Sequence, residues 1–200
     1  MTSEELQRAF KYLFPNEVPA LKHLAQQLPP NPVVVNIGAG AGTSGLALLE
    51  ARPDLILLTI DVQYEDSPFG CIKAEWGLVK EAGYMARYGW VEGGSIQIGR
   101  NYQLQPSPDF AMVFIDGEHS YEGCRGDIEA WLPNIKPGGI IAVHDYKKES
   151  LYTDDYHADL PHPNYPHPRA WPGVDQAVDE LLLNRYELVM RVDSLIAFKV

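Results

Sequence analysis

Ionisable side chains directly follow two apolar runs of this sequence. Asp116 ends the run 110–116, His119 comes shortly after it, and Asp145 ends the run 139–145. Short apolar runs of this kind predict buried strands, and packing gives a buried strand no reason to end in a charged group. Either the chain simply reaches water at these two points, or the strand ends are places where chemistry happens.

The spacing of the two aspartates predicts that they lie on neighbouring strands. The interval from Asp116 to Asp145 fits one strand–helix–strand unit, whose two strands are parallel and end at the same edge of the sheet. Two carboxylates about 5 Å apart repel each other by about 3 kcal/mol at an effective dielectric of about 20. A bound divalent cation, a shared proton, or hydrogen bonds to loop backbone and cofactor would each offset that repulsion.

Two histidines accompany these aspartates. An alcohol that attacks an electrophilic carbon must lose a proton, and it does so at neutral pH only with the help of a base or a metal. His119 is the candidate catalytic base, beside Asp116; helix capping and a cofactor contact are its alternative roles. His144 precedes Asp145 along the predicted strand, so its side chain is expected on the opposite face, in a structural role.

A glycine-rich turn follows the first long apolar run. Gly38, Gly40 and Gly42 would let a ligand approach the backbone, and the next helix would offer free N–H groups at its start. Asp61 ends the next predicted strand, about 20 residues on, where a carboxylate can accept both hydroxyls of a ribose. Gly40, Gly42 and Gly45 also match the pattern GxGxxG, which leaves a dinucleotide as an alternative ligand.

The rest of the chain alternates helical and strand periodicity. This alternation predicts an α/β fold, a Rossmann-like three-layer sandwich around a mostly parallel seven-stranded sheet. The last two strands are joined too tightly to be parallel, so an antiparallel C-terminal hairpin is expected at one edge. Strands are predicted at 33–37, 55–61, 95–99, 110–116, 139–145, 186–192 and 194–200, and helices after a capping box at Thr2 and Glu5 and at 18–28, 45–52, parts of 73–90, 122–135 and 173–184.

Length and composition predict one domain, residues 1–200, in a cytoplasmic protein. Residues 1–30 would be an N-terminal helical segment, and residues 146–170 a lid or insertion loop beside the aspartates. The net charge of −11 repels phosphate backbones, so a small-molecule substrate is expected rather than nucleic acid. The sequence has two isolated cysteines and no apolar run near the roughly 20 residues that span a bilayer, and it leaves a homo-oligomer open.

Several segments together resemble the class I S-adenosylmethionine-dependent methyltransferases. The matching pieces lie between residues 33 and 200: the loop NIGAGAG, the strand end LTIDV, the segments FIDGEHSYEG and IKPGGIIAVHD, and the closing hairpin. The two longer segments are similar to the small-molecule branch that includes macrolide-sugar and catechol-type O-methyltransferases. The resemblance implies a Rossmann-like fold and S-adenosylmethionine as the methyl donor.

Carried over by position, the resemblance implies a set of cofactor-binding residues. Asp61 would bind the ribose, Val62 would pack on the adenine, and Asp116 would lie beside the methyl donor. Asn36 stands where the family usually has an acid that contacts the amino group of the cofactor. The methionine part would be held by Gly38, Gly40, Gly42, Thr43 and Ser44, and the adenine edge would be contacted by Gly99, Arg100 and Asn101 after the third strand.

The resemblance also bears on the metal. In metal-dependent members, acids after the fourth and fifth strands hold Mg²⁺ beside the methyl donor, and Asp116 and Asp145 match those positions. Tyr146 stands where the third ligand is usually Asp or Asn. The implied activity is methyl transfer from S-adenosylmethionine to an oxygen of a small molecule, a sugar or phenolic hydroxyl, with Mg²⁺ assistance left open.

Two other functions stay open at this point. An NAD-dependent oxidoreductase would use the GxGxxG letters of Gly40, Gly42 and Gly45. A non-catalytic nucleotide-binding subunit with the same fold would account for the departures at Asn36 and Tyr146.

Overall fold

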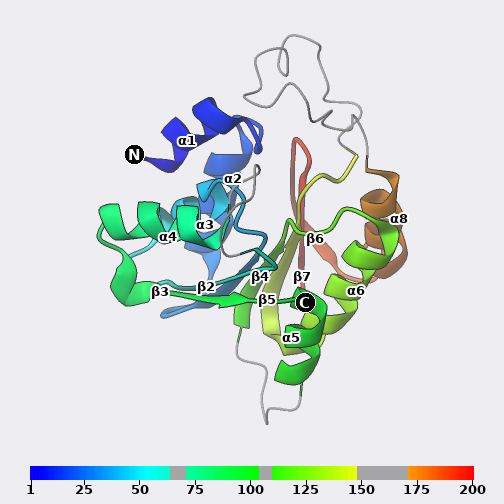
Figure 1. Ribbon diagram of the computed structural model, residues 1–200. Helices are drawn as coiled ribbons and strands as arrows, with labels where there is room; N and C mark the ends of the chain where they lie inside the picture. Colours follow the sequence, from blue (N-terminus) through cyan, green and yellow to red (C-terminus); the bar gives the residue numbers. More distant parts are fainter. Residues whose placement is uncertain (64–70, 104–109, 148–170) are drawn as a thin grey trace.

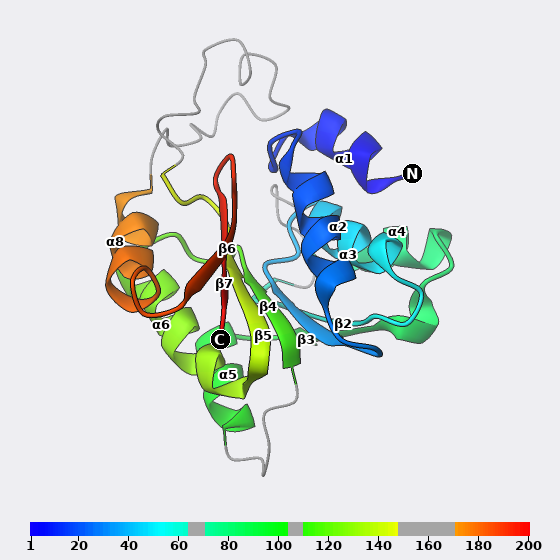
Figure 2. The ribbon, with the colours of Figure 1, turned by 180° about the vertical axis from the view of Figure 1, so that it is seen from behind.

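The computed structural model describes residues 1–63, 71–103, 110–147 and 171–200. A seven-stranded sheet runs through these residues, and helices cover both of its faces (Figures 1 and 2). The strand order is β3-β2-β1-β4-β5-β7-β6. The strands are β1 (Val33–Ile37), β2 (Ile56–Asp61), β3 (Tyr88–Glu92), β4 (Phe110–Ile115), β5 (Ile135–Val143), β6 (Glu187–Val192) and β7 (Leu195–Lys199).

The first five strands are parallel. β1 lies between β2 and β4, β2 also pairs with β3, and β4 also pairs with β5. β7 runs antiparallel to both β5 and β6, which confirms the predicted C-terminal hairpin at one edge. The order of the strands reverses between β1 and β4, and open α/β sheets bind their ligands at such a switch point.

Two groups of helices form the outer layers (Figure 1). On one face α1, α2 and α4 pack around α3, and on the other α6 packs between α5 and α8. The α-helices are α1 (Ser3–Phe10), α2 (Glu17–Gln27), α3 (Thr43–Ala51), α4 (Ile72–Glu81), α5 (Ser95–Tyr102), α6 (Tyr121–Trp131) and α8 (Pro172–Leu181), and the short 3-10 helices are η1 (Met85–Arg87) and η2 (Leu132–Asn134).

The core consists of two apolar layers, one on each face of the sheet. Successive residues of a strand point to opposite faces, so Val34 packs beneath α2 and α3, whereas Val35 packs in the layer of α6 and α8. Because both faces are covered, β4 is buried at every position. This explains the continuous apolar run that precedes Asp116 in the sequence.

The predicted capping box is confirmed at the start of α1. The Thr2 hydroxyl accepts from the Glu5 backbone N–H at 3.2 Å, and the Glu5 carboxylate accepts from the Thr2 backbone N–H at 2.8 Å. The helix ends at Phe10, and Lys11 after it has a left-handed conformation with φ of 55°. That conformation turns the chain away from the helix axis, and residues 11–14 then cross the carboxyl ends of the strands.

The third strand is not where the sequence predicts it. The prediction of a strand at 95–99 is wrong, because these residues begin α5, and the third strand is β3 in a segment predicted to be partly helical. Ile96 packs closely against Gly126, and Gly99 packs closely against the Trp131 ring, both on α6, so the segment packs as a helix face. β3 is an edge strand and partly exposed, and it therefore lacks a continuous apolar run.

Most of the predicted lid or insertion loop, residues 148–170, lies outside the described residues. Its two described residues, Tyr146 and Lys147, turn from the end of β5 toward α8, where the Tyr146 hydroxyl donates to Asp179 at 2.7 Å. Within the described ranges, no helix is long and apolar enough to cross a membrane.

Candidate functional site

A pocket of about 720 Å³ lies at the carboxyl ends of the parallel strands. Residues that follow each of the five parallel strands line it, together with residues 11–14 and with Trp171 just before α8. The volume is within the range of small-molecule sites, and the location is the switch point between β1 and β4. The pocket therefore brings together the predicted glycine loop and the predicted strand-end acids.

The glycine loop passes too close to β4 for a side chain. Gly38 has a φ of 93°, and a Cβ atom there would lie 2.1 Å from the carbonyl oxygen of Asp116. Gly42, with a φ of 85°, is the last residue before α3 and faces α4. The loop thus turns directly from β1 into α3, and the residues of the loop and helix start that line the pocket are Gly38, Ala39, Gly40, Ala41, Thr43 and Ser44.

We expect Gly38→Ala to destabilise the fold by about 3 kcal/mol or more, because the new methyl group overlaps backbone that cannot move freely. Thermal denaturation followed by circular dichroism measures this loss. Gly83→Ala is the matched control, since Gly83 has a φ of 80° but a Cβ there meets no atom within 4 Å. The control should lose only about 1 to 2 kcal/mol from the left-handed backbone. Equal losses in the two variants would contradict the role assigned to Gly38.

Asn36 lies beneath the glycine loop and is fully buried. Its amide donates to the Gly38 carbonyl at 3.1 Å, and its carbonyl oxygen accepts from the Ser44 hydroxyl at 3.2 Å. Among the described residues, the pocket wall includes Gly38 and Ser44 but not Asn36. The side chain at this position therefore shapes the loop from behind, and any contact of Asn36 with a ligand would run through these two residues.

Asp61, at the end of β2, is held by the backbone around it. Its carboxylate accepts from the N–H of Ala39 at 2.7 Å and from that of Gln63 at 2.9 Å. Asp61 lines the pocket beside Val62, a residue that is 68% exposed. An oriented carboxylate next to an exposed apolar side chain is suited to a ligand with a polar sugar and a flat apolar base.

Four ionisable side chains gather where β4 and β5 end. His119 Nε2 lies 3.0 Å from Asp145 Oδ2 and 3.6 Å from Asp116 Oδ1. His144 Nδ1 lies 3.2 Å from Asp116 Oδ1 and 3.4 Å from Asp145 Oδ1. Each aspartate thus has an imidazole nitrogen of each histidine beside it. The repulsion between the two carboxylates is offset by side chains of the protein, a solution that the sequence reasoning did not include.

The prediction that His144 points away from this cluster is wrong. Alternation along a strand holds only while the backbone stays extended, and β5 ends at Val143. Asp145 has a left-handed conformation with φ of 64°, which rotates its side chain back toward that of His144. Both residues are buried and line the pocket, and His144 contacts the Asp116 side chain.

The pKa values of the cluster follow from burial and charge. Burial opposes protonation of both histidines, but the neighbouring carboxylates outweigh it. They raise the pKa of His119 to about 9, and Asp116, Glu17 and Asp145 raise the pKa of His144 well above its usual value. Burial also opposes ionisation of Asp116, and the two histidines nevertheless lower its pKa. At neutral pH both histidines therefore carry protons beside an ionised Asp116.

Trp171 covers the other side of His119. The two rings are stacked, with centroids 4.4 Å apart and planes inclined by 20°. The imidazole is thus held between the indole and the aspartates, with 26% of its side chain exposed to the pocket. This fixes the direction in which the ring can exchange a proton with a bound molecule.

The cluster also bears on the predicted Mg²⁺. Possible ligand atoms of Asp116, His144 and Asp145 lie within 4.8 Å of one another. Mg²⁺ demands octahedral oxygen ligands, whereas here one of three donors is an imidazole nitrogen, and the phenol of Tyr146 is turned away to Asp179. These residues do not fit Mg²⁺, and its binding stays a prediction.

Several pocket residues were missed by the sequence reasoning. Ser95 at the start of α5 donates to Asp127 on α6 at 2.5 Å, and both line the pocket. Burial raises the pKa of Asp127 to about 6 despite this hydrogen bond. An acid at a buried position of an amphipathic helix was the available signal for Asp127. The wall residues 11–14 carried no such signal.

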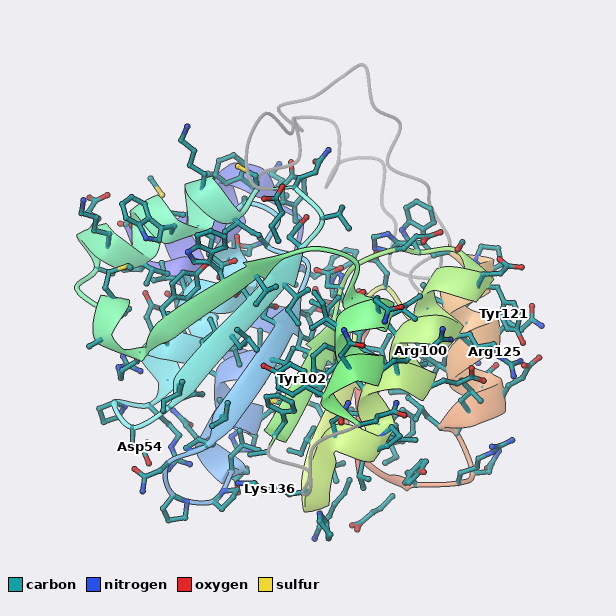
Figure 3. All side chains as sticks on the ribbon, turned by 60° about the horizontal axis from the view of Figure 1, so that its bottom comes forward. Asp54, Arg100, Tyr102, Tyr121, Arg125 and Lys136 are labelled. Atoms are coloured by element: carbon teal, nitrogen blue, oxygen red, sulfur yellow. The ribbon has the colours of Figure 1, made fainter. Side chains whose placement is uncertain are left out.

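The three residues predicted at the adenine edge lie elsewhere. Gly99 is buried against the Trp131 ring, and Arg100 and Asn101 are exposed on α5; in the described parts of the chain none of them lines the pocket. Figure 3 shows Arg100 in the layer of α5 and α6. The misplacement follows from the wrong third strand, because the residues that do follow β3 and line the pocket are Gly93, Gly94, Ser95 and Ile96.

Known structures share this fold over nearly the whole chain. A Staphylococcus aureus protein provisionally described as a caffeoyl-CoA O-methyltransferase aligns over 100% of this chain and 93% of its own, with a TM-score of 0.68 and 15% identity. The O-methyltransferase TomG from Streptomyces achromogenes, in complex with S-adenosylmethionine, aligns over 99% and 87%, with a TM-score of 0.66 and 21% identity. The methyltransferase PaMTH1 from Podospora anserina, with bound S-adenosylhomocysteine, aligns over 98% and 84%, with a TM-score of 0.66 and 21% identity.

The sequence itself also matches a known family. No curated protein matches the chain. Residues 35–146, more than half of the chain, match the family described as "methyltransferase domain", and the match runs from β1 through both strand-end aspartates. The protein therefore belongs to this methyltransferase family and has the fold of the S-adenosylmethionine-dependent O-methyltransferases.

Proposed function

We propose that this protein transfers the methyl group of S-adenosylmethionine to an oxygen of a small molecule, a sugar or phenolic hydroxyl. The observation that carries the proposal is His119, held beside Asp116 and Asp145 in the same pocket as Asp61 and the glycine loop. A group for accepting a proton and a group for binding a ribose thus line one cavity. The aromatic side chains of Tyr12, Phe14 and Trp171 in the pocket wall suit a ring-shaped acceptor.

Different residues of the chain bind the cofactor and accept the proton. Asp61 accepts hydrogen bonds from the ribose hydroxyls, Val62 packs on the adenine, and the loop with Thr43 and Ser44 holds the methionine part. Bound S-adenosylmethionine supplies an electrophilic methyl group on a sulfonium. His119 orients the acceptor hydroxyl and takes its proton at Nδ1, because Nε2 already donates toward Asp145, while the oxygen–carbon bond forms and the carbon–sulfur bond breaks. Asp145 stabilises the imidazolium that results.

Most of the rate enhancement comes from the pocket wall, which places the acceptor oxygen against the methyl group. Holding the acceptor oxygen against the methyl group at near-attack distance replaces a bimolecular encounter by an oriented one. Trp171 and residues 11–14 exclude water from this position. The neutral form of His119 is the active one, so we expect methyl transfer to increase with pH toward the His119 pKa of about 9.

Isothermal titration calorimetry tests the cofactor directly. S-adenosylhomocysteine is expected to bind, and NAD is expected to give no heat. Heat with NAD alone would replace the proposal by the oxidoreductase alternative. Methylation of catechol and of a nucleotide-linked hexose, followed by mass spectrometry, then tests the reaction. Binding of S-adenosylhomocysteine without any methylated product would favour the non-catalytic subunit.

The same assay tests the metal. If the histidines supply the positive charge beside Asp116 and Asp145, dialysis against EDTA leaves the rate unchanged. Restoration of a lost rate by Mg²⁺ would show that the prediction of Mg²⁺ was correct despite the poor match of the donors.

A further inference from the structure

Glu17 is a fully buried acid that no motif in the sequence singles out. It is the first residue of α2 and lies below the wall residues 11–14. Its Oε1 accepts from the backbone N–H and the hydroxyl of Ser194, at 2.8 and 2.6 Å, and its Oε2 accepts from the backbone N–H of Phe14 at 2.6 Å. A buried carboxylate persists only when its oxygens are bonded in this way.

The remaining partner of Glu17 is His144. Glu17 Oε2 lies 2.9 Å from His144 Nε2, and the other ring nitrogen, Nδ1, lies 3.2 Å from Asp116 Oδ1. The ring is therefore held between one carboxylate outside the pocket and one inside it. A carboxylate behind a functional imidazole fixes the orientation and the protonated nitrogen of the ring.

Glu17 also joins three segments that are distant in sequence. Phe14 belongs to the pocket wall, His144 follows β5, and Ser194 lies in the turn between β6 and β7. In Figures 1 and 2 the connection between α1 and α2 and the turn between β6 and β7 lie at the same end of the sheet. The acceptor side of the pocket and the aspartates thus share one anchor.

We infer that Glu17 is a positioning residue for methyl transfer. It holds the His144 ring against Asp116, and it holds the wall residues 11–14 over Asp116 and Asp145. The inference rests on the proposed function. Glu17 is expected to affect only the acceptor side of the pocket, because the glycine loop and Asp61 make no contact with Glu17 among the interactions described above. Loss of the Glu17 charge should therefore impair turnover and spare the cofactor.

Nuclear magnetic resonance tests the anchor without any acceptor. The His144 Nε2 proton should give a downfield imidazole N–H resonance, assigned by its absence in His144→Asn. Glu17→Gln, which keeps the size of the side chain, should remove or shift this resonance. Glu4→Gln is the matched control, because Glu4 is an acid of the neighbouring helix α1 that pairs with Lys22 at the surface. An unchanged resonance in Glu17→Gln would overturn the inference.

Kinetics with catechol as acceptor test the consequence. Glu17→Gln is expected to lower kcat about 10- to 100-fold, since small misplacements of catalytic groups have effects of this size. The dissociation constant of S-adenosylhomocysteine should stay within about twofold of the wild-type value. A merely structural role would lower the melting temperature without separating kcat from cofactor affinity.

A second variant covers the case in which Glu17→Gln does not fold. Ser194→Ala removes one donor to Glu17 and should lower kcat about fivefold, the equivalent of one hydrogen bond. Wild-type kcat in this variant would overturn the inference. If the wild-type protein binds no S-adenosylhomocysteine, the proposed function fails instead, while the resonance of His144 still decides whether Glu17 holds the ring.

Discussion

Replacing His119 with glutamine is expected to lower kcat for methyl transfer to catechol about 100- to 1,000-fold. A positioned base contributes a factor of this order, and glutamine preserves hydrogen bonding but accepts no proton at neutral pH. His119 Nε2 lies 3.0 Å from Asp145, so this carboxylate stabilises the imidazolium that forms when the other ring nitrogen takes the proton. Affinity for S-adenosylhomocysteine should change little, because the ribose and methionine contacts of the cofactor are assigned to Asp61 and the glycine loop and not to His119.

The pH profile provides the control for this substitution. Nearby carboxylates raise the pKa of His119 to about 9, so the neutral base is scarce at pH 7 and its population grows about tenfold per pH unit. The wild-type rate should rise accordingly from pH 6.5 to 8, and a bound sulfonium should shift the rise to lower pH by repelling the imidazolium. The His119→Gln profile should be flat over this interval. A rise of equal slope in the variant would show that another group is the base.

The second large effect concerns the cofactor. We expect Asp61→Asn to weaken S-adenosylhomocysteine binding about 10- to 100-fold, because hydrogen bonds from ribose hydroxyls to a charged carboxylate are stronger than those to an amide. The amide oxygen still accepts from one of the backbone N–H groups of Ala39 and Gln63, which limits damage to the loop. Calorimetric titration measures the change.

Asp54→Asn is the matched control for Asp61→Asn. Asp54 lies before β2 rather than after it, pairs with Arg52, and is seen at the margin of the molecule in Figure 3. Its loss should leave the affinity unchanged. An Asp61→Asn protein with wild-type affinity would mean that the ribose is held elsewhere in the pocket, or that the ligand has none.

The parts of the fold that local pattern determines were predictable. The continuous apolar runs of β1, β2, β4 and β5 reflect burial on both faces, and the spacing of Asp116 and Asp145 reflects one crossover between parallel neighbours. The edge strand β3 was missed because it is partly exposed, and its sequence therefore lacks the continuous apolar run that marks a buried strand. α5 was mistaken for a strand because two isoleucines in a short segment fit the periodicity of a helix as well as that of a strand.

The site was predictable only where its residues are close in sequence. Asp116 and His119 stand in one turn, and Asp61 follows a strand end, so simple topology brings them to the pocket. The direction of His144 depends on the left-handed backbone of Asp145, which the residue type does not reveal. Glu17 depends on contacts across 127 and 177 positions of the chain, and periodicity carries no information about such contacts.

The bond between Glu17 and Ser194 also sets an order of events during synthesis on the ribosome. The first turn of α2 emerges early, but its acid receives its last partners only when the turn before β7 has been made, 177 residues later. At ordinary translation rates this takes on the order of 10 s. Until then the Glu17 carboxylate lacks its hydrogen bonds from Ser194, at the place where His144 must dock. The cluster of Asp116, His119, His144 and Asp145 is therefore expected to assemble as one of the last events of folding, after the parallel strands have paired.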